Sequence, residues 1–271
     1  MGESSGTASA AGAAPAALRF SGEVTDFYQR FRRGYPLAVL DAIVAAFALG
    51  EDDVVLDLGC GTGQLTVPMA ARVRLAAGMD PSPDMLARAR QTAVDAGAGN
   101  TAWLLGGDTD VAAVQPILAG LGAVTVGQAL HWMDHERLFA AVKPLLRPGG
   151  GIAVVTNGEP LWLQDSAWSR ALRSALAAWF GVALSATCGT DQASQDRYRA
   201  ALAAAGYSTA TTTVQYSGNL TAAEVIGGVY SAIDPVPPDE RPAFEDRIRT
   251  AIEPHAPFTE PVRVRILTGR G

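Results

Sequence analysis

The chain has 271 residues, of which 48% are hydrophobic and 18% charged. This balance excludes bulk disorder and supplies enough apolar material for a large core, in one domain with insertions or in a domain with a small cap. The formal net charge of −6 argues against the broad basic surface that duplex nucleic acid requires.

Two cysteines, Cys60 and Cys188, are too few for a disulfide framework, and no Cys/His cluster predicts a structural metal site. We therefore expect no metal and a reducing, cytoplasmic location. Residues 1–20 begin with an Ala-, Gly- and Ser-rich stretch that lacks the positive start and bulky apolar run of a signal peptide, so we predict a disordered tail. No apolar run approaches the roughly 20 residues of a membrane span.

From residue 36 onward, short apolar runs alternate with segments of helical periodicity. The runs predict buried parallel strands at residues 54–56, 73–79, 101–105, 123–126 and 152–156. The periodic segments predict helices at residues 36–49, from 64, 83–96, 111–118 and 135–146. This alternation predicts an α/β fold of the Rossmann-like kind, with a mainly parallel sheet flanked by helices.

Past Asn157 the pattern changes. Helical segments are predicted at residues 161–180, 191–205, 222–233 and 240–252. Two β-like segments, residues 208–216 and 262–267, bring the predicted strands to seven. We predict a single domain over residues 21–271, with helical cap elements at about 158–190 and 218–255 that cover the sheet.

The strongest local signal is the run Asp57-Leu58-Gly59-Cys60-Gly61-Thr62-Gly63, which follows a predicted strand and opens a helix. Glycines let the backbone approach a ligand closely, and a helix start favours an anion. The dinucleotide fingerprint does not fit, because Gln64 stands where its third glycine is required. Asp57 would repel a pyrophosphate but suits an ammonium group. S-adenosylmethionine, which carries amino, carboxylate and sulfonium groups, fits this pattern.

Two further acids follow the next two predicted strands. Asp80 can accept both ribose hydroxyls, and Asp108 can accept a hydrogen bond from the adenine amine. Met85 can pack on the adenine face. Because open α/β sheets bind ligands at the carboxyl ends of their strands, we predict one cofactor site there. That site also includes the small residues of the turn and two flanking positions: Gly59, Cys60, Gly61, Gly63, Pro81 and Gly107.

These elements resemble the class I S-adenosylmethionine-dependent methyltransferases over residues 24–157. The matched segments, in the expected order, are Asp57–Gly63, Asp80, Gly107-Asp108, Gln128–Trp132 and Leu146-Arg147-Pro148-Gly149-Gly150. The resemblance implies S-adenosylmethionine as cofactor, with Gln128 and Ala129 beside it. One departure is that Leu121-Gly122-Ala123 lacks the acid that the family usually carries before the fourth strand.

A narrower resemblance points to the small-molecule subfamily that includes trans-aconitate methyltransferases. It rests on Arg33-Gly34-Tyr35-Pro36, on Gln128-Ala129-Leu130-His131-Trp132 and on the late segment Leu220 to Ile252. We find no second arginine cluster clearly placed for a polyacid, so we discount that substrate.

His131 follows the fourth predicted strand, at the edge where substrate should meet cofactor, and we predict that it is a general base. The alternative is that His131 only packs or binds a carbonyl, and that proximity alone drives transfer. Trp132, Trp162, Trp168 and Tyr35 are predicted to bind substrate, with ordinary core packing as the alternative for the tryptophans.

Tyr28 and Arg33 are predicted to fold over the cofactor, with Arg33 pairing with its carboxylate; a solvated basic stretch is the alternative. The predicted activity is methyl transfer to a small, apolar or aromatic organic molecule, with no nucleic-acid and no membrane partner. An RNA methyltransferase and a non-catalytic S-adenosylmethionine-binding protein are the alternatives.

Overall fold

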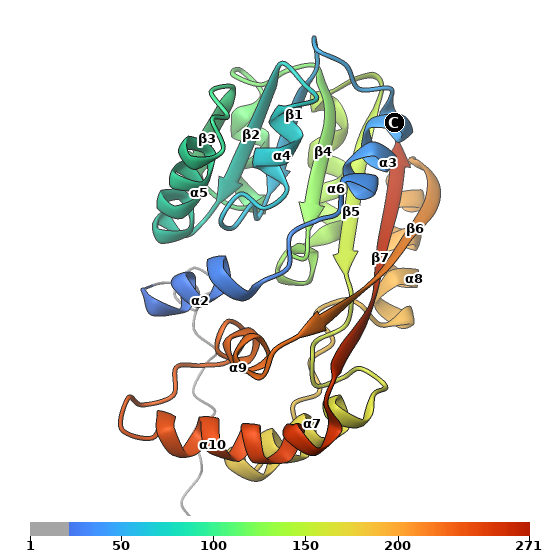
Figure 1. Cartoon of the computed structure of the whole chain (residues 1–271). Helices are drawn as coiled ribbons and strands as arrows, with labels where there is room; N and C mark the ends of the chain where they lie inside the picture. The colour runs from blue at the N-terminus through green and yellow to red at the C-terminus, as the bar shows by residue number, and fades with distance from the viewer. Residues whose placement is uncertain (1–21) are drawn as a thin grey trace, which may run out of the picture.

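The computed structural model describes residues 22–271 (Figure 1). The predicted tail, residues 1–20, lies outside the described residues. Within the described part, no helix combines the length and the apolar character needed to cross a bilayer.

A seven-stranded sheet forms the centre of the fold, in the order β3-β2-β1-β4-β5-β7-β6. The strands are β1 (Val54–Leu58), β2 (Leu75–Asp80), β3 (Thr101–Leu105), β4 (Leu121–Gly127), β5 (Leu146–Asn157), β6 (Ser208–Leu220) and β7 (Phe258–Arg270). The pairs β3-β2, β2-β1, β1-β4 and β4-β5 are parallel, whereas β7 runs antiparallel to β5 and β6. The predicted Rossmann-like, mainly parallel sheet of seven strands is confirmed.

Side-chain alternation divides the sheet into two apolar faces. On one face, β1 residues such as Leu56 pack with α6 (His135–Val142), α8 (Gln192–Ala204) and the short helix η1 (Asp108–Val114). On the other face, Val55 packs with α3 (Leu37–Phe47) and α4 (Thr66–Ala70). The helix α5 (Pro83–Asp95) lies against β2 and β3. Both faces of the central strands are therefore buried, as their continuous apolar runs require.

The strand order reverses between β1 and β4, from which the sheet extends outward in opposite directions. In the register, Val55 lies opposite Ala76 of β2 on one side and Ala123 of β4 on the other. A crevice at the carboxyl ends of such strands is the usual ligand site of open α/β sheets.

Three helices form a layer beyond the carboxyl ends of the parallel strands (Figure 1). They are α7 (Ala167–Phe180), α9 (Ala222–Tyr230) and α10 (Arg241–Ile252), and they pack around a third apolar cluster that includes Trp168, Leu172 and Phe244. The helix α2 (Glu23–Phe31) lies between this layer and the sheet and contacts α9. Of these four helices, α2 and α9 lie nearest to the edge of the sheet where the glycine turn emerges.

Two of the differences from the sequence prediction concern the helices around this edge. The α2 helix was not predicted; it is held by tertiary contacts, since the Phe27 ring stacks 4.9 Å from Tyr230 and the Phe31 ring covers Gly227. The predicted helix at 161–180 begins only at Ala167, because the Ser166 side chain accepts a hydrogen bond from the Ser169 backbone N–H and caps the first turn.

Candidate active site

A cavity of about 500 Å³ lies at the carboxyl ends of β1, β2 and β4. Residues of α2 and of the loops that lead into the helical layer close its other side. This volume falls in the range of small-molecule and cofactor sites. Most of the predicted cofactor residues line it, namely Tyr28, Arg33, Gly59, Gly61, Asp80, Pro81, Met85, Gly107, Asp108, Gln128 and Ala129.

The three glycines of the turn all have a left-handed backbone, with φ angles of 64° at Gly59, 54° at Gly61 and 82° at Gly63. A Cβ at Gly59 would lie 2.5 Å from the Ala129 Cβ, whereas one at Gly61 would find nothing closer than the Tyr28 ring at 3.6 Å. Gly61 therefore presents bare backbone to the cavity, and Gly59 allows the turn to pack against the β4 loop.

Gly63 and Cys60 do not line the cavity, in contrast to the prediction that they bind the cofactor. A Cβ at Gly63 would lie 3.0 Å from Val67 and 3.1 Å from Trp103, so this glycine serves helix-to-sheet packing. The Cys60 side chain is buried against Gly78, and burial raises the pKa of its thiol well above the usual range. These two residues pack the turn against the helix and the sheet, on the side away from the cavity.

Asp57 is buried behind the turn and also does not line the cavity. The Thr66 hydroxyl donates to its Oδ2 at 2.5 Å, and the Thr125 hydroxyl donates to its Oδ1 at 2.7 Å. Burial raises the pKa of Asp57 to about 6, against the lowering effect of the two hydroxyls. The carboxylate thus ties β1 to β4 and α4, which differs from the predicted direct contact with an ammonium group.

Asp80 ends β2 and faces the cavity. Its Oδ2 accepts the Gly61 backbone N–H and its Oδ1 accepts the Ser82 N–H, each at 2.9 Å. Burial raises the pKa of Asp80, while these two hydrogen bonds favour the charged form. Each carboxylate oxygen keeps a further lone pair, so the group can accept a pair of ligand hydroxyls.

Met85, Pro81 and Asp108 line the cavity on the side of α5 and η1. Met85 is buried in the first turn of α5, whose start is capped by Ser82. The Asp108 Oδ2 accepts the backbone N–H of Asp134 at 3.0 Å, which fixes the carboxylate at the cavity wall. An apolar flank beside a fixed acceptor is the arrangement that an adenine ring with its exocyclic amine requires.

Gln128 follows β4 with a left-handed φ of 54°, an uncommon conformation for a residue other than glycine. Its backbone N–H donates to Val155 O at 2.9 Å and its Nε2 donates to Gly158 O at 3.4 Å. The buried Oε1 has no hydrogen-bond partner among residues 22–271. Strained backbone and an unsatisfied acceptor at a cavity wall are typical of ligand-binding positions.

His131 and Trp132 lie in the short helix η2 (Leu130–Trp132) and both line the cavity. Burial lowers the pKa of His131 to about 4, and the nearby Arg32 charge contributes to this lowering. The imidazole is therefore neutral at pH 7 and can accept a proton. Trp132 is 45% exposed, with its ring centroid 4.9 Å from that of His131.

Arg33 forms an ion pair across the cavity wall, with its Nη1 at 2.7 Å from Glu260 Oε1. Glu260 therefore competes with the cofactor carboxylate, which Arg33 was predicted to bind. Tyr28 lies over Gly61, and the Arg32 guanidinium stacks on the Tyr28 ring at 5.3 Å. These residues bring the end of α2 over the glycine turn.

Of the other predicted substrate residues, Trp162 lines the cavity, and its buried Nε1 has no hydrogen-bond partner within the described chain. Trp168 and Tyr35, which were also predicted to bind substrate, do not line the cavity. Trp168 is part of α7 and is buried within the helical layer, where its Nε1 donates to Thr259 O at 3.0 Å. Tyr35 packs with the α3 face of the sheet, beside Gly127.

Sequence reasoning missed several wall residues that come from distant segments, namely Phe31, Leu161, Leu220 and Glu260. Of these residues, only Glu260 could have been recognised from the sequence pattern. It occupies the buried register of β7, in which Phe258, Val262, Val264 and Ile266 are apolar. A carboxylate in such a position requires a buried partner.

Residues 55–150 match the family described as "Methyltransferase domain". This region carries the glycine turn, Asp80, Asp108 and Gln128. Over these residues the chain is similar to methyltransferase domains.

Two curated relatives match part of the chain. The "Uncharacterized methyltransferase Rv3342" of Mycobacterium tuberculosis is 35% identical over 136 residues, which is 50% of this chain and 51% of that protein. The "Probable S-adenosylmethionine-dependent methyltransferase CRG1" of Saccharomyces cerevisiae is 29% identical over 127 residues, 46% of this chain and 43% of that protein. The chain spans about half the length of the curated relatives it matches.

Among solved structures, a putative type II methyltransferase from Anaeromyxobacter dehalogenans superposes with a TM-score of 0.55 at 19% identity, over 89% of this chain and 97% of that one. A putative methyltransferase from Bacillus halodurans superposes with a TM-score of 0.53 at 15% identity, over 86% and 98%. At this identity the similarity establishes the fold.

Proposed function

We propose that the protein transfers the methyl group of S-adenosylmethionine to a small, largely apolar or aromatic molecule. The observation that carries this proposal is the two-sided character of the cavity. Acidic and amide groups of Asp80, Asp108 and Gln128 line its sheet side, while Phe31, Leu161, Trp162 and Leu220 line the side of the helical layer. An apolar wall with few polar groups is typical of small-molecule sites.

The chain offers groups for the ribose, the adenine and the ammonium of the cofactor. Asp80 would accept the ribose hydroxyls, Asp108 the adenine amine, and Met85 would pack on the ring. The unsatisfied Gln128 Oε1 fits the ammonium group, because it is a buried acceptor in need of a donor. When bound, the cofactor supplies a methyl group on a sulfonium, which is already a good leaving group.

The protein's own contribution is alignment, exclusion of water and acceptance of a proton. The neutral His131 imidazole would take the proton of a hydroxyl, amine or acidic carbon nucleophile. The Trp162 Nε1–H is a buried donor without a partner in the described chain, so it would orient an acceptor of the substrate. The end of α2, with Tyr28 and Arg32, would cover the reacting centre.

Calorimetric titration with S-adenosylhomocysteine tests the cofactor site. Asp80→Asn removes a charged acceptor, so affinity should fall by about 1–3 kcal/mol, on the order of 5- to 150-fold. Asp95→Asn, an exposed change at the end of α5, is the matched control and should bind like wild type. Equal affinities of the two variants would contradict the site.

Release of S-adenosylhomocysteine in the presence of phenols, indoles and organic acids tests the activity. Turnover with an apolar or aromatic member of the panel supports the proposal. Cofactor binding with persistent lack of turnover would favour a non-catalytic binding protein, and RNA binding that weakens steeply with salt would favour an RNA substrate.

A further inference from the structure

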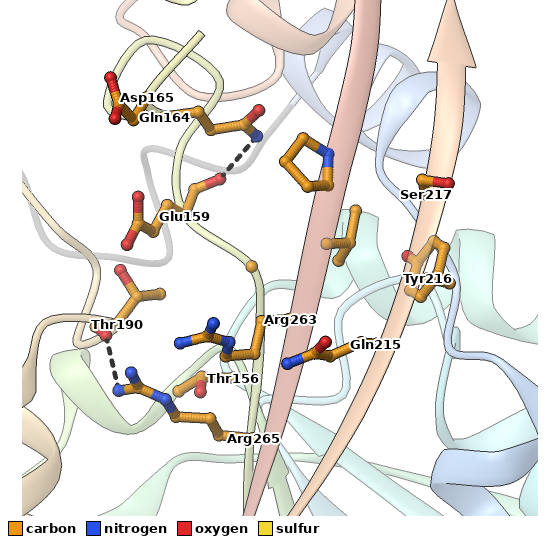
Figure 2. Close-up of a pocket in the computed structure, with 13 residues that line it drawn as sticks. Thr156, Glu159, Gln164, Asp165, Thr190, Gln215, Tyr216, Ser217, Arg263 and Arg265 are labelled. Atoms are coloured by element: carbon orange, nitrogen blue, oxygen red, sulfur yellow. Dashed lines mark hydrogen bonds between the residues drawn. The ribbon is translucent and has the colours of Figure 1, made fainter.

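A second cavity, of about 480 Å³, lies beside the first. Figure 2 shows it between β7, β6 and the segments that carry Glu159, Gln164 and Thr190. Gly158 and Glu159 line both cavities and form part of the partition between them. The methyl-transfer site makes no use of this second space.

Two arginines of β7 form one end of the second cavity. Arg263 and Arg265 are two residues apart on a strand, so both side chains project from the same face of the sheet. In the register they lie opposite Gln215 and Thr213 of β6. Figure 2 shows both side chains extending from β7 in the same direction, toward the segment that holds Thr190.

Neither guanidinium is neutralised within the described chain. No carboxylate of residues 22–271 forms an ion pair with Arg263 or Arg265. The Arg265 Nη1 donates one long hydrogen bond, 3.4 Å, to Thr190 O. Arg263 is exposed and Arg265 is half-buried, so water rather than a carboxylate screens their charges, and both guanidinium groups are available to an anion.

The two acids of the cavity lie at its rim and leave that positive charge uncompensated. Asp165 is 98% exposed at its side chain and pairs with Arg170 at 2.5 Å. Glu159 is exposed and its backbone carbonyl, not its carboxylate, accepts a hydrogen bond from Gln164. The cavity therefore has a positively charged end at Arg263 and Arg265, and exposed acids at its opening.

The opposite end of the cavity is polar and partly unsatisfied. Gln164, which Figure 2 shows away from the arginines, is only 5% exposed. Its Nε2 donates to Glu260 Oε1 at 2.7 Å, so the amide orientation is fixed. The buried Oε1 has no partner among the described residues. This end therefore requires a hydrogen-bond donor.

We propose that the second cavity binds a small molecule that carries an oxyanion, either a carboxylate or a phosphate, together with a hydroxyl or amine. Arg263 and Arg265 hold the oxyanion through charge-assisted hydrogen bonds, for which the planar guanidinium is well suited. The hydroxyl or amine donates to Gln164. This site is independent of methyl transfer, and its occupancy is measured without the methyl donor.

Calorimetry and thermal unfolding test the site with two pairs of probes: L-malate against succinate, and glycerol 3-phosphate against inorganic phosphate. Each first member adds a hydroxyl to the oxyanion. Wild type should bind at least one hydroxylated probe at millimolar concentration, several-fold more tightly than its partner. The pair that binds identifies the anion as carboxylate or phosphate.

Arg263→Gln is the main variant, because it leaves the Arg265–Thr190 hydrogen bond in place. Its affinity for the bound probe should fall about tenfold or more, the scale of one lost charge-assisted hydrogen bond. Arg249→Gln, an exposed change on α10, is the control and should bind like wild type. S-adenosylhomocysteine affinity, measured in parallel, should be unchanged in both variants. The proposal is overturned if no probe binds to wild type, or if Arg263→Gln binds as tightly as the control.

Discussion

Arg33 and Glu260 join the two ends of the described chain at the wall of the cofactor cavity. Arg33 follows α2, Glu260 lies near the start of β7, and their side chains meet at 2.7 Å. The Glu260 side chain is 2% exposed and also accepts the Gln164 amide at 2.7 Å. The pair therefore holds α2 against the C-terminal strand, where α2 covers the glycine turn.

Loss of Arg33 should destabilise the fold, because it leaves a buried carboxylate with only an amide partner. We expect Arg33→Ala to lower the free energy of unfolding by roughly 2–4 kcal/mol, somewhat below a fully buried pair because Arg33 is partly exposed. Urea unfolding measures it. Arg30→Ala, on the exposed side of α2, is the control, and the double variant Arg33→Ala/Glu260→Gln should regain part of the loss. If Arg33→Ala unfolds like the control, the ion pair does not hold α2.

Much of the fold could be predicted because its signals are local. Continuous apolar runs identified the parallel strands, and the spacing of Asp57, Asp80 and Asp108 identified one edge of the sheet. The spacing of Val24, Phe27 and Phe31 is also helical and fits α2. The start of that helix carries no sequence signal, because its N-cap residue, Gly22, has no side chain to cap it.

The parts that could not be predicted depend on distant partners. Arg33 was assigned to the cofactor because Glu260, its actual partner, lies far along the chain. Trp162 and Trp168 looked equivalent, yet the Ser166 cap between them starts a helix that directs Trp168 into the core. Asp57 looked like a ligand residue because its actual partner, the Thr125 hydroxyl, lies far along the chain. The pairing of β1 with β4 brings the two together.

Gly59 and Gly61 have different roles: Gly59 allows close packing of the turn, and Gly61 leaves room for a ligand. Both have left-handed backbones, so alanine at either should cost about 1 kcal/mol of backbone strain. Gly59→Ala also forces a Cβ to within 2.5 Å of Ala129, and its total loss should reach roughly 2–4 kcal/mol. Gly61→Ala should stay folded and lose S-adenosylhomocysteine affinity, because its methyl group enters the cavity. Thermal unfolding and calorimetry of both variants measure the contrast. Similar unfolding losses for the two would contradict this division.

Asp57 should make stability depend on pH. Its pKa is raised to about 6 in the folded state, above the unfolded value of 3.8, so ionisation opposes folding. The protonated carboxyl therefore stabilises the fold relative to the ionised form. This stabilisation is fully present below pH 3.8 and is lost as the pH rises through 6. An asparagine side chain at this position would not titrate and could keep a hydrogen bond to each threonine. Between about pH 5 and pH 7.5, the stability of wild type relative to Asp57→Asn should fall by about 1.4 kcal/mol. A constant difference in urea unfolding across that range would refute the buried, titrating carboxylate.

His131 should stay neutral far below the usual range of histidine. Burial lowers its pKa to about 4 from 6.5, so the proton-accepting form persists down to about pH 4. Its contribution to stability is intact above pH 6.5 and is lost as the pH falls through 4, because the unfolded state binds the proton first. Proton NMR of the imidazole, assigned with His131→Gln, should give a midpoint near 4, and turnover should be flat above about pH 5. Lower turnover in His131→Gln with unchanged cofactor affinity would identify a base. A midpoint near the ordinary value of 6.5 would mean that the ring is solvated and outside the closed cavity.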